Sequence, residues 1–317
     1  MVLVGIIIGS YSVYAAEYTM KISAGVTGDE CPWYRGTDYL EKRVPQLTGG
    51  KVEVKTYKGT LQTGRRIIED VKLGTVEGLI ETTGPLSGFV PRATIFNLPM
   101  LFKGFDHLFK AVDGPFGDSI AKDAEKSGFK ILGWWSYGAR MVYHNGKPIR
   151  TVEDIKGMKI RTQESPEFLS LYKSYGAQPV PMQWTEVYSG LQQGVIDGAD
   201  ATLGAGIASK HIEVVKYAAL IDHVLAVSPI LVSLKWWDAL PQDTKTALEK
   251  AFKEAQPIAR EADKVQAQQL VLDWEKRGKI VTRPDLGGFQ KAAEKVYVEL
   301  KDKINQQDLA WVKQVGQ

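Results

Sequence analysis

The stretch GMKIRTQESPEFL, residues 157–169, joins a strand pattern to a helix start and indicates the fold class. Its first residues alternate apolar and charged side chains, which is typical of a short strand with one buried face. Ser165 is a good N-cap, Pro166 suits the first helical position, and Glu167 is favourable near the positive end of a helix. A strand followed at once by a helix is the repeating unit of α/β proteins.

Arg161 stands where this strand is expected to end. In open α/β sheets, ligands bind beyond the carboxyl ends of the strands. A guanidinium group offers a planar fork that fits a carboxylate, and the N–H groups of the following helix start favour an anion at the same place. The stretch therefore predicts a carboxylate site at Arg161. A structural ion pair between Arg161 and an internal Asp or Glu fits the same residues.

Strand and helix patterns alternate along the rest of the chain. Strands are expected at 18–26 and around Val52, and helices at 34–46 and 65–73. This alternation predicts an α/β protein with mostly parallel sheets. With 317 residues and no low-complexity linker, we expect two lobes whose hinge is made of strands that cross from one lobe to the other.

A helical pattern runs from Pro241 to about Arg277 and contains Pro257. If it forms one helix, it is long enough to brace two lobes. Because proline interrupts the hydrogen bonding of a helix, two separate helices that meet at Pro257 are the alternative.

The composition excludes several classes of function. The chain has 40 basic and 37 acidic residues and no long basic tract, so no nucleic-acid partner is expected. It has one cysteine, Cys31, and four histidines without metal-ligand spacing, so we expect neither a disulfide nor a metal site. The segment 203–209 contains G-x-G but lacks the rest of a dinucleotide fingerprint, and no cofactor is expected.

The first residues, MVLVGIIIGSYSVYAAEY, resemble the end of a secretory signal peptide. A short apolar run precedes small residues at Val13 and Ala15, which suit cleavage before Ala16 or Glu17. The run is shorter than the ~20 apolar residues that span a membrane. We expect residues 1–16 to be a signal-peptide remnant, although a buried N-terminal strand fits the same run.

A second segment, residues 179–200, is expected to face the same crevice as Arg161. A proline-rich turn leads to Thr185 as an N-cap, and Trp184 precedes that helix. Trp184 can cover a ligand or belong to the core. The strand that follows places Asp200 nearby, and Asp200 is the single candidate for a catalytic base. No nucleophile–base pair accompanies it, so an enzyme is not expected.

Several motifs, in a consistent order, resemble the periplasmic solute receptors of TRAP transporters (tripartite ATP-independent periplasmic, DctP type). The motifs are LTGGKVEVKTYKG, RRIIEDVKLGTVEG, FNLPMLF, ILGWWSYGARMVYHNGKPI, VEDIKGMKIR and PMQWTEVYSGLQQGVIDGAD. The resemblance as a whole covers nearly all of the mature chain. The resemblance implies a two-lobed periplasmic binding protein fold with crossing hinge strands and a long bracing helix. It also implies a division into lobe I (residues 17–138 plus 227–266) and lobe II (residues 139–226 plus 267–317).

The resemblance also implies roles for individual residues. In the family, the arginine of the K-x-R segment binds the ligand carboxylate, and here that residue is Arg161. The assisting arginine corresponds to Arg140, and the aromatic residue that covers the ligand corresponds to Trp184. The polar contacts that the first lobe usually contributes match Ser23 and Thr83.

The chain departs from the family after Gly198. The family often has an acidic residue or glutamine followed by a ligand-binding asparagine, but here Asp200 is followed by Ala201. The side chain of Ala201 cannot form a hydrogen bond with a ligand. Together with the large face of Trp184, this favours a monocarboxylate with an apolar or aromatic body, while two arginines keep dicarboxylates and sugar acids open.

The resemblance makes the leading hypothesis a non-enzymatic receptor in the periplasm. It would capture an organic acid and deliver it to the small and large membrane subunits of a TRAP transporter, without spanning the membrane itself. An extracellular sensor that reports the same acid to a signalling partner is the alternative, and an enzyme acting on organic acids is a third.

Overall fold

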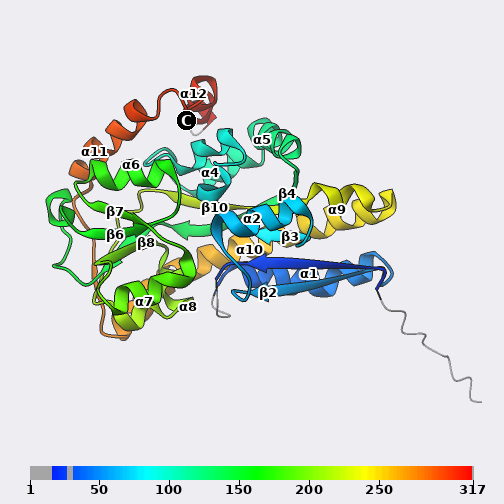
Figure 1. The fold of residues 1–317 in the computed structure, drawn as a ribbon, viewed down its shortest axis with the longest axis horizontal. Helices are drawn as coiled ribbons and strands as arrows, with labels where there is room; N and C mark the ends of the chain where they lie inside the picture. The colour runs from blue at the N-terminus through cyan, green and yellow to red at the C-terminus, as the bar shows by residue number, and fades with distance from the viewer. Residues whose placement is uncertain (1–15, 27–30, 316–317) are drawn as a thin grey trace, which may run out of the picture.

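A computed structural model of the protein describes residues 16–26 and 31–315 (Figure 1). The signal peptide expected at residues 1–16 lies almost entirely outside the described residues. None of the described helices is long and apolar enough to cross a membrane. The described chain forms two sheets with helices packed around them, as expected for an α/β protein.

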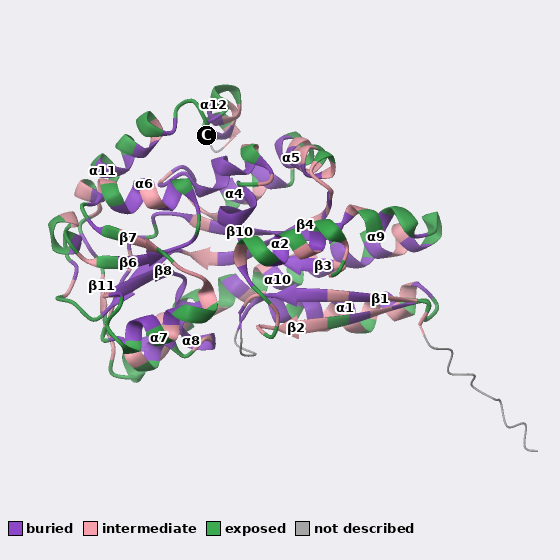
Figure 2. Cartoon of the chain, viewed as in Figure 1, coloured by how far each residue is buried: buried purple, intermediate pink, exposed green. Residues whose placement is uncertain are grey.

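The first sheet has five strands in the order β2-β1-β3-β10-β4. β3 and β10 are buried along nearly their whole length, whereas the edge strand β2 is buried only at Val52 and Val54 (Figure 2). The strands are β1 (Tyr18–Ala24), β2 (Val52–Lys58), β3 (Gly78–Ile80), β4 (Phe129–Ala139) and β10 (Leu225–Ser233).

The second sheet has six strands in the order β11-β9-β5-β8-β6-β7. Its central strands β5 and β8 are buried along their whole length. The strands are β5 (Met141–His144), β6 (Lys159–Thr162), β7 (Gln178–Pro181), β8 (Gly198–Ala201), β9 (Tyr217–Ala219) and β11 (Ile280–Thr282).

The chain passes from one sheet to the other three times, twice through short segments and once through the helices between β10 and β11. Only Arg140 separates β4 from β5, and residues 220–224 separate β9 from β10. The strand that follows each short crossing runs antiparallel to its neighbours, β5 in the second sheet and β10 in the first. Each sheet is therefore mostly parallel, as expected, with one reversed strand in its interior.

The helices lie on both sides of the sheets. α1 packs against β2 and α10, α5 packs against β4, and α6 packs against β7. The α-helices are α1 (Trp33–Leu47), α2 (Gly64–Leu73), α3 (Thr83–Leu86), α4 (Phe105–Val112), α5 (Pro115–Lys126), α6 (Pro166–Ser174), α7 (Val187–Gln192), α8 (Leu203–Ala208), α9 (Leu234–Ala239), α10 (Gln242–Lys276), α11 (Leu286–Glu299) and α12 (Gln306–Val315). The short 3-10 helices are η1 (Pro91–Asn97), η2 (Val152–Ile155), η3 (Trp184–Glu186) and η4 (His211–Val214).

α10 is one continuous helix of 35 residues that includes Pro257. The alternative of two helices is therefore wrong. Its first half packs against α1 and β4 of the first lobe, and its second half contacts α8 and β11 of the second. The many contacts along its length offset the single backbone hydrogen bond that proline cannot donate.

The division into two lobes at the residue boundaries given above stays a proposal. The C-terminal helices differ in their packing. α11 packs against α6, whereas α12 packs against α4, and Asp308 in α12 pairs with Arg92 at 2.7 Å. The end of the chain therefore returns to the helices of the first sheet.

At two helix starts, the structure differs in detail from the N-caps expected from the sequence. Ser165 is the N-cap residue of α6, but its hydroxyl donates to the carboxylate of Glu167 instead of accepting from the helix backbone. Thr185 lies inside η3 and caps no helix, since this turn continues directly into α7. At Thr151, a capping box with Asp154 is present at the start of η2.

Candidate functional site

A cavity of about 50 Å³ lies between the two sheets. The first lobe contributes the ends of β1 and β3 and the aromatic rings of Trp33 and Tyr137. The second contributes Arg140, Arg161 and Trp184. Residues far apart in the sequence meet here because the crossing at Arg140 lies in the wall of the cavity. The cavity thus sits where closure of two lobes would enclose a ligand.

Arg161 is at the carboxyl end of β6 and only 5% exposed. Its Nε donates to the carbonyl oxygen of Met182 at 3.0 Å, and its guanidinium lies 5.2 Å from the ring centre of Trp184. Burial and the nearby Arg140 lower the pKa of Arg161 from its ordinary value. Among the described residues no Asp or Glu pairs with it, so the structural ion pair that the sequence left open is not formed.

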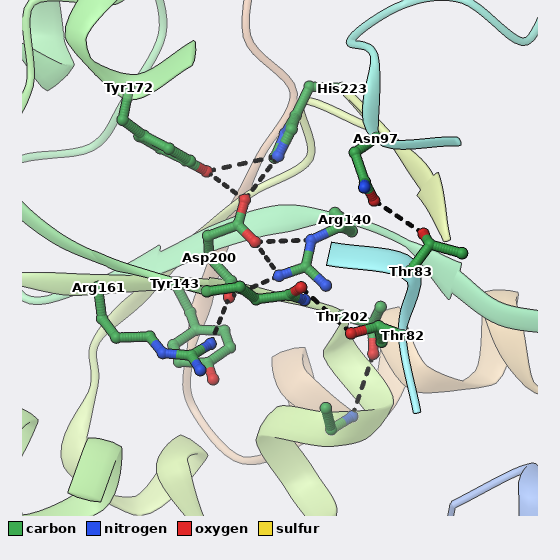
Figure 3. A network of polar contacts seen from close by, with 12 residues as sticks. Thr82, Thr83, Asn97, Arg140, Tyr143, Arg161, Tyr172, Asp200, Thr202 and His223 are labelled. Carbon is green, nitrogen blue, oxygen red and sulfur yellow. Dashed lines mark hydrogen bonds and ion pairs between the residues drawn. The ribbon is translucent and has the colours of Figure 1, made fainter. Parts of the chain in front are cut away.

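Arg140 is buried and bound to Asp200. Its Nε donates to Asp200 Oδ1 at 2.6 Å, and its Nη2 donates to the same carboxylate oxygen (Figure 3). The guanidinium also lies 4.7 Å from the ring centre of Phe168. The charge of Arg140 is therefore compensated within the protein, unlike that of Arg161.

Asp200 is fully buried and holds three partners. Besides Arg140, Tyr172 Oη donates to Oδ2 at 2.6 Å, and His223 Nε2 lies 2.6 Å from the same oxygen (Figure 3). Burial raises the pKa of Asp200, but Arg140 and His223 outweigh it and hold the pKa well below its usual range. Asp200 is therefore an ionised anchor behind the cavity wall.

The polar residues expected from the first lobe lie beside the cavity and not in its wall. Ser23 is buried in β1, and the hydroxyl of Thr83 donates to Asn97 Oδ1 at 2.8 Å, away from the cavity (Figure 3). The neighbouring Thr82 and Glu81 line the cavity instead. Glu81 accepts hydrogen bonds from the backbone N–H groups of Thr82 at 2.8 Å and Gly64 at 3.0 Å.

The apolar part of the wall is aromatic. Trp33 and Tyr137 stack with their ring centres 4.3 Å apart. Trp184 is fixed by a hydrogen bond from its Nε1 to Ser209 Oγ at 2.9 Å, with its ring 4.6 Å from that of His211. Ala201 faces the cavity at the end of β8. Trp134 and Trp135 are core residues outside the wall.

Several hydrogen bonds join the lobes around the cavity. Thr94 Oγ1 in η1 donates to Glu167 Oε1 in α6 at 2.6 Å, and Thr63 Oγ1 donates to Gln183 Oε1 at 3.3 Å. Glu167 is 2% exposed, so its carboxylate depends on such donors. The lobes are therefore in contact through hydrogen bonds between polar side chains around the cavity.

Two α/β lobes that are joined by crossing strands and that enclose a buried site define the class of two-lobed solute-binding proteins. Residues 23–303 match the family model of the bacterial extracellular solute-binding proteins, family 7, which is the DctP family. The chain belongs to this family of TRAP-transporter solute receptors, which consists of binding proteins and not of enzymes.

Individual relatives agree with this membership. The 2,3-diketo-L-gulonate-binding periplasmic protein of Escherichia coli K12 is 31% identical over 80% of this chain and 77% of its own. A TRAP solute-binding protein of Sulfurospirillum deleyianum with bound succinate is 30% identical, with a TM-score of 0.89 over 95% of this chain and 99% of its own. One from Polaromonas with bound D-erythronate is 27% identical, with a TM-score of 0.90 over 93% and 98%.

Among the described residues, no cluster of His, Cys, Asp or Glu could hold a metal ion. The one cysteine, Cys31, is free and buried, and burial raises the pKa of its thiol to about 12. Neither feature adds a reactive group to the cavity, and the chemistry that the wall offers is the binding of an anion.

Proposed function

We propose that this protein is the extracytoplasmic receptor of a TRAP transporter and that it binds an organic acid between its lobes. The single observation that carries the proposal is Arg161, a guanidinium that is buried in the cavity wall without a carboxylate partner among the described residues. An uncompensated buried charge is costly, so a bound carboxylate would complete the site. The relatives with bound succinate and D-erythronate support this, since both ligands carry carboxylates.

We assign the ligand carboxylate to Arg161, with Trp184 covering it and Arg140 adding positive potential. We assign an indirect role, without contact to the ligand, to three residues behind the cavity wall: Asp200, Thr83 and Ser23. Asp200 holds Arg140, and the other two lie in the buried structure around the cavity.

For the ligand, we propose a monocarboxylate with a compact apolar body. Glu81 in the wall would repel a second carboxylate, while Ala201, Trp33 and Tyr137 offer apolar contacts. A cavity of about 150 Å³ holds a benzene ring. The cavity of about 50 Å³ is smaller, so an aromatic acid would need the lobes to stand further apart.

The mechanism would be closure of the two lobes on the acid. A ligand that contacts both lobes favours the closed state by its differential affinity for that state. The closed receptor would then deliver the acid to the small and large membrane subunits of the transporter. We place the protein in the periplasm, exported by the signal peptide proposed at residues 1–16.

Isothermal titration calorimetry with a panel of carboxylic acids tests the proposal. The panel would include short aliphatic, aromatic and sugar acids and C4-dicarboxylates, each titrated into wild type, Arg161→Ala and Arg161→Lys. Truncating one partner of a buried charge pair costs about 2–5 kcal/mol, so Arg161→Ala should weaken binding by roughly 30-fold to several thousand-fold. Arg161→Lys keeps the charge without the planar fork, so its affinity should lie between those of wild type and Arg161→Ala.

Arg277→Ala, which removes an exposed arginine at the end of α10, is the matched control and should bind as wild type does. Equal affinity of Arg161→Ala and wild type for the best acid would contradict the assignment. If wild type binds none of the acids, the proposed function is wrong.

A further inference from the structure

Gln163 directly follows β6, and its side chain reaches the cavity, as that of Arg161 does. It follows Arg161 by two residues, and side chains two apart in an extended segment point to the same side. It is 7% exposed and lines the cavity. The sequence offered no role for it, and neither the fold nor the proposed function requires a glutamine here.

The amide of Gln163 connects Arg140 to the first lobe. Its orientation is fixed by its neighbours, since only one orientation satisfies both ends. Oε1 accepts from Arg140 Nη1 at 2.7 Å and from Nη2 at 3.1 Å, and Nε2 donates to Thr82 Oγ1 at 3.1 Å. The amide of Gln163 thus lies at the Nη1 and Nη2 edge of the Arg140 guanidinium and also reaches Thr82 of lobe I.

With this contact, each nitrogen of the Arg140 guanidinium has a protein acceptor. A guanidinium has five N–H donors. In Arg140, Nε and Nη2 donate to the carboxylate of Asp200, Nη2 also donates to its backbone oxygen at 3.1 Å, and Gln163 accepts from Nη1 and Nη2. Arg161 differs, since its protein acceptors are two backbone oxygens, one of them at the long distance of 3.5 Å. The two arginines therefore differ in what they can still bind.

The first lobe leaves room for the amide at Gly84. A Cβ atom at residue 84 would overlap the terminal amide of Gln163. Gly84 has an ordinary helical backbone in α3, so its conformation does not require glycine. The absence of a side chain is instead what lets Gln163 extend across to Thr82.

We propose that Gln163 determines specificity by occupying the place beside Arg140 where a second carboxylate of a ligand would bind. Its amide oxygen is a neutral substitute for a carboxylate oxygen, and it leaves Arg161 as the single anion-binding arginine. The receptor therefore prefers acids with one carboxylate over dicarboxylic acids of the same length. This inference rests on the proposed function and names the feature of the site that would restrict its ligands.

Butyrate and succinate are the probes, because both have four carbons and differ in the second carboxylate. Calorimetry would measure the dissociation constant of each for wild type, Gln163→Ala, Gln163→Glu and Gln183→Ala. The readout is the ratio of the two constants, which cancels general effects on lobe closure. Gln183→Ala is the matched control, since Gln183 also lines the cavity and bridges the lobes through Thr63 but does not contact Arg140. Thermal melts would check that each variant is folded.

Gln163→Ala should shift the ratio towards succinate by at least about tenfold, the value of one charge-assisted hydrogen bond. Gln163→Glu, which puts a carboxylate beside Arg140, should shift the ratio of dissociation constants away from succinate. Gln183→Ala should leave this ratio unchanged. If butyrate binds wild type and no Gln163 variant changes the ratio, this inference is overturned while the proposed function stands. If neither acid binds any of the variants or wild type, the inference fails, and the wider acid panel then decides the proposed function separately.

Discussion

Replacing Asp263 with asparagine should stabilise the protein at pH 8 and leave its stability nearly unchanged at pH 4. Asp263 lies in α10, is 5% exposed, and accepts a hydrogen bond from Ser136 Oγ of β4. Burial raises the pKa of this carboxyl from its ordinary value of 3.8 to about 6, although the hydrogen bond from Ser136 acts in the opposite direction. The side chain has no basic partner among the described residues.

The magnitude follows from that pKa. The change from 3.8 to about 6 is about two pH units, and at 1.36 kcal/mol per unit it corresponds to about 3 kcal/mol. Because the folded pKa is the higher one, the folded protein binds more protons than the unfolded chain between about pH 4 and pH 6. The stabilising contribution of Asp263 to the free energy of unfolding is therefore fully present below pH 4 and is lost as the pH rises through 6. Asparagine resembles the protonated carboxyl and avoids this loss.

Urea unfolding of wild type and Asp263→Asn at a series of pH values tests the prediction. The difference in free energy of unfolding should be close to zero at pH 4 and should rise to at most about 3 kcal/mol in favour of the variant above pH 7. Glu261→Gln controls for the loss of a negative charge, since Glu261 is exposed on the same helix. A difference that is the same at all pH values, or that favours wild type at pH 8, would refute the reasoning.

Two further changes concern buried carboxylates. Asp200→Asn leaves a buried arginine uncompensated and should lower the free energy of unfolding by about 3–5 kcal/mol in urea titrations; a loss under about 1 kcal/mol would be typical of a surface pair and would contradict the buried network. Thr94→Val removes the 2.6 Å hydrogen bond to Glu167 between the lobes, at a cost of about 1.5–3 kcal/mol. It should raise the radius of gyration in small-angle X-ray scattering, whereas the exposed Thr246→Val should not; equal radii would show that this bond does not hold the lobes together.

Much of the fold could be predicted because it depends on local patterns. The strand β6 (Lys159–Thr162) and the helix after it appear directly in the alternation of apolar residues and in the residues at the helix start. The direction of β5 and β10 could not be predicted in this way. Strand direction depends on which sheet a crossing strand enters, and that is decided by packing between distant segments.

The candidate site was predictable at Arg161 for the same reason, since a strand end and a helix start are local features. The partner of Arg140 was not, because the contact with Asp200 joins residues 60 positions apart and depends on the pairing of β5 with β8. Gln163 could have been noticed from its spacing to Arg161. Its role, however, depends on Thr82 and Gly84 of the other lobe, and no spacing in the sequence shows that they meet.

Arg140 is the one residue between β4 and β5, and its backbone N–H donates to Val224 on the returning segment at 2.9 Å. The same residue thus forms part of the cavity wall and of a crossing between the lobes. An apparent dissociation constant equals the intrinsic one divided by the fraction of molecules in the binding-competent state. Changes at Arg140 would alter both quantities together. A substitution at this one residue would therefore change the range of ligands and the ease of closure at the same time.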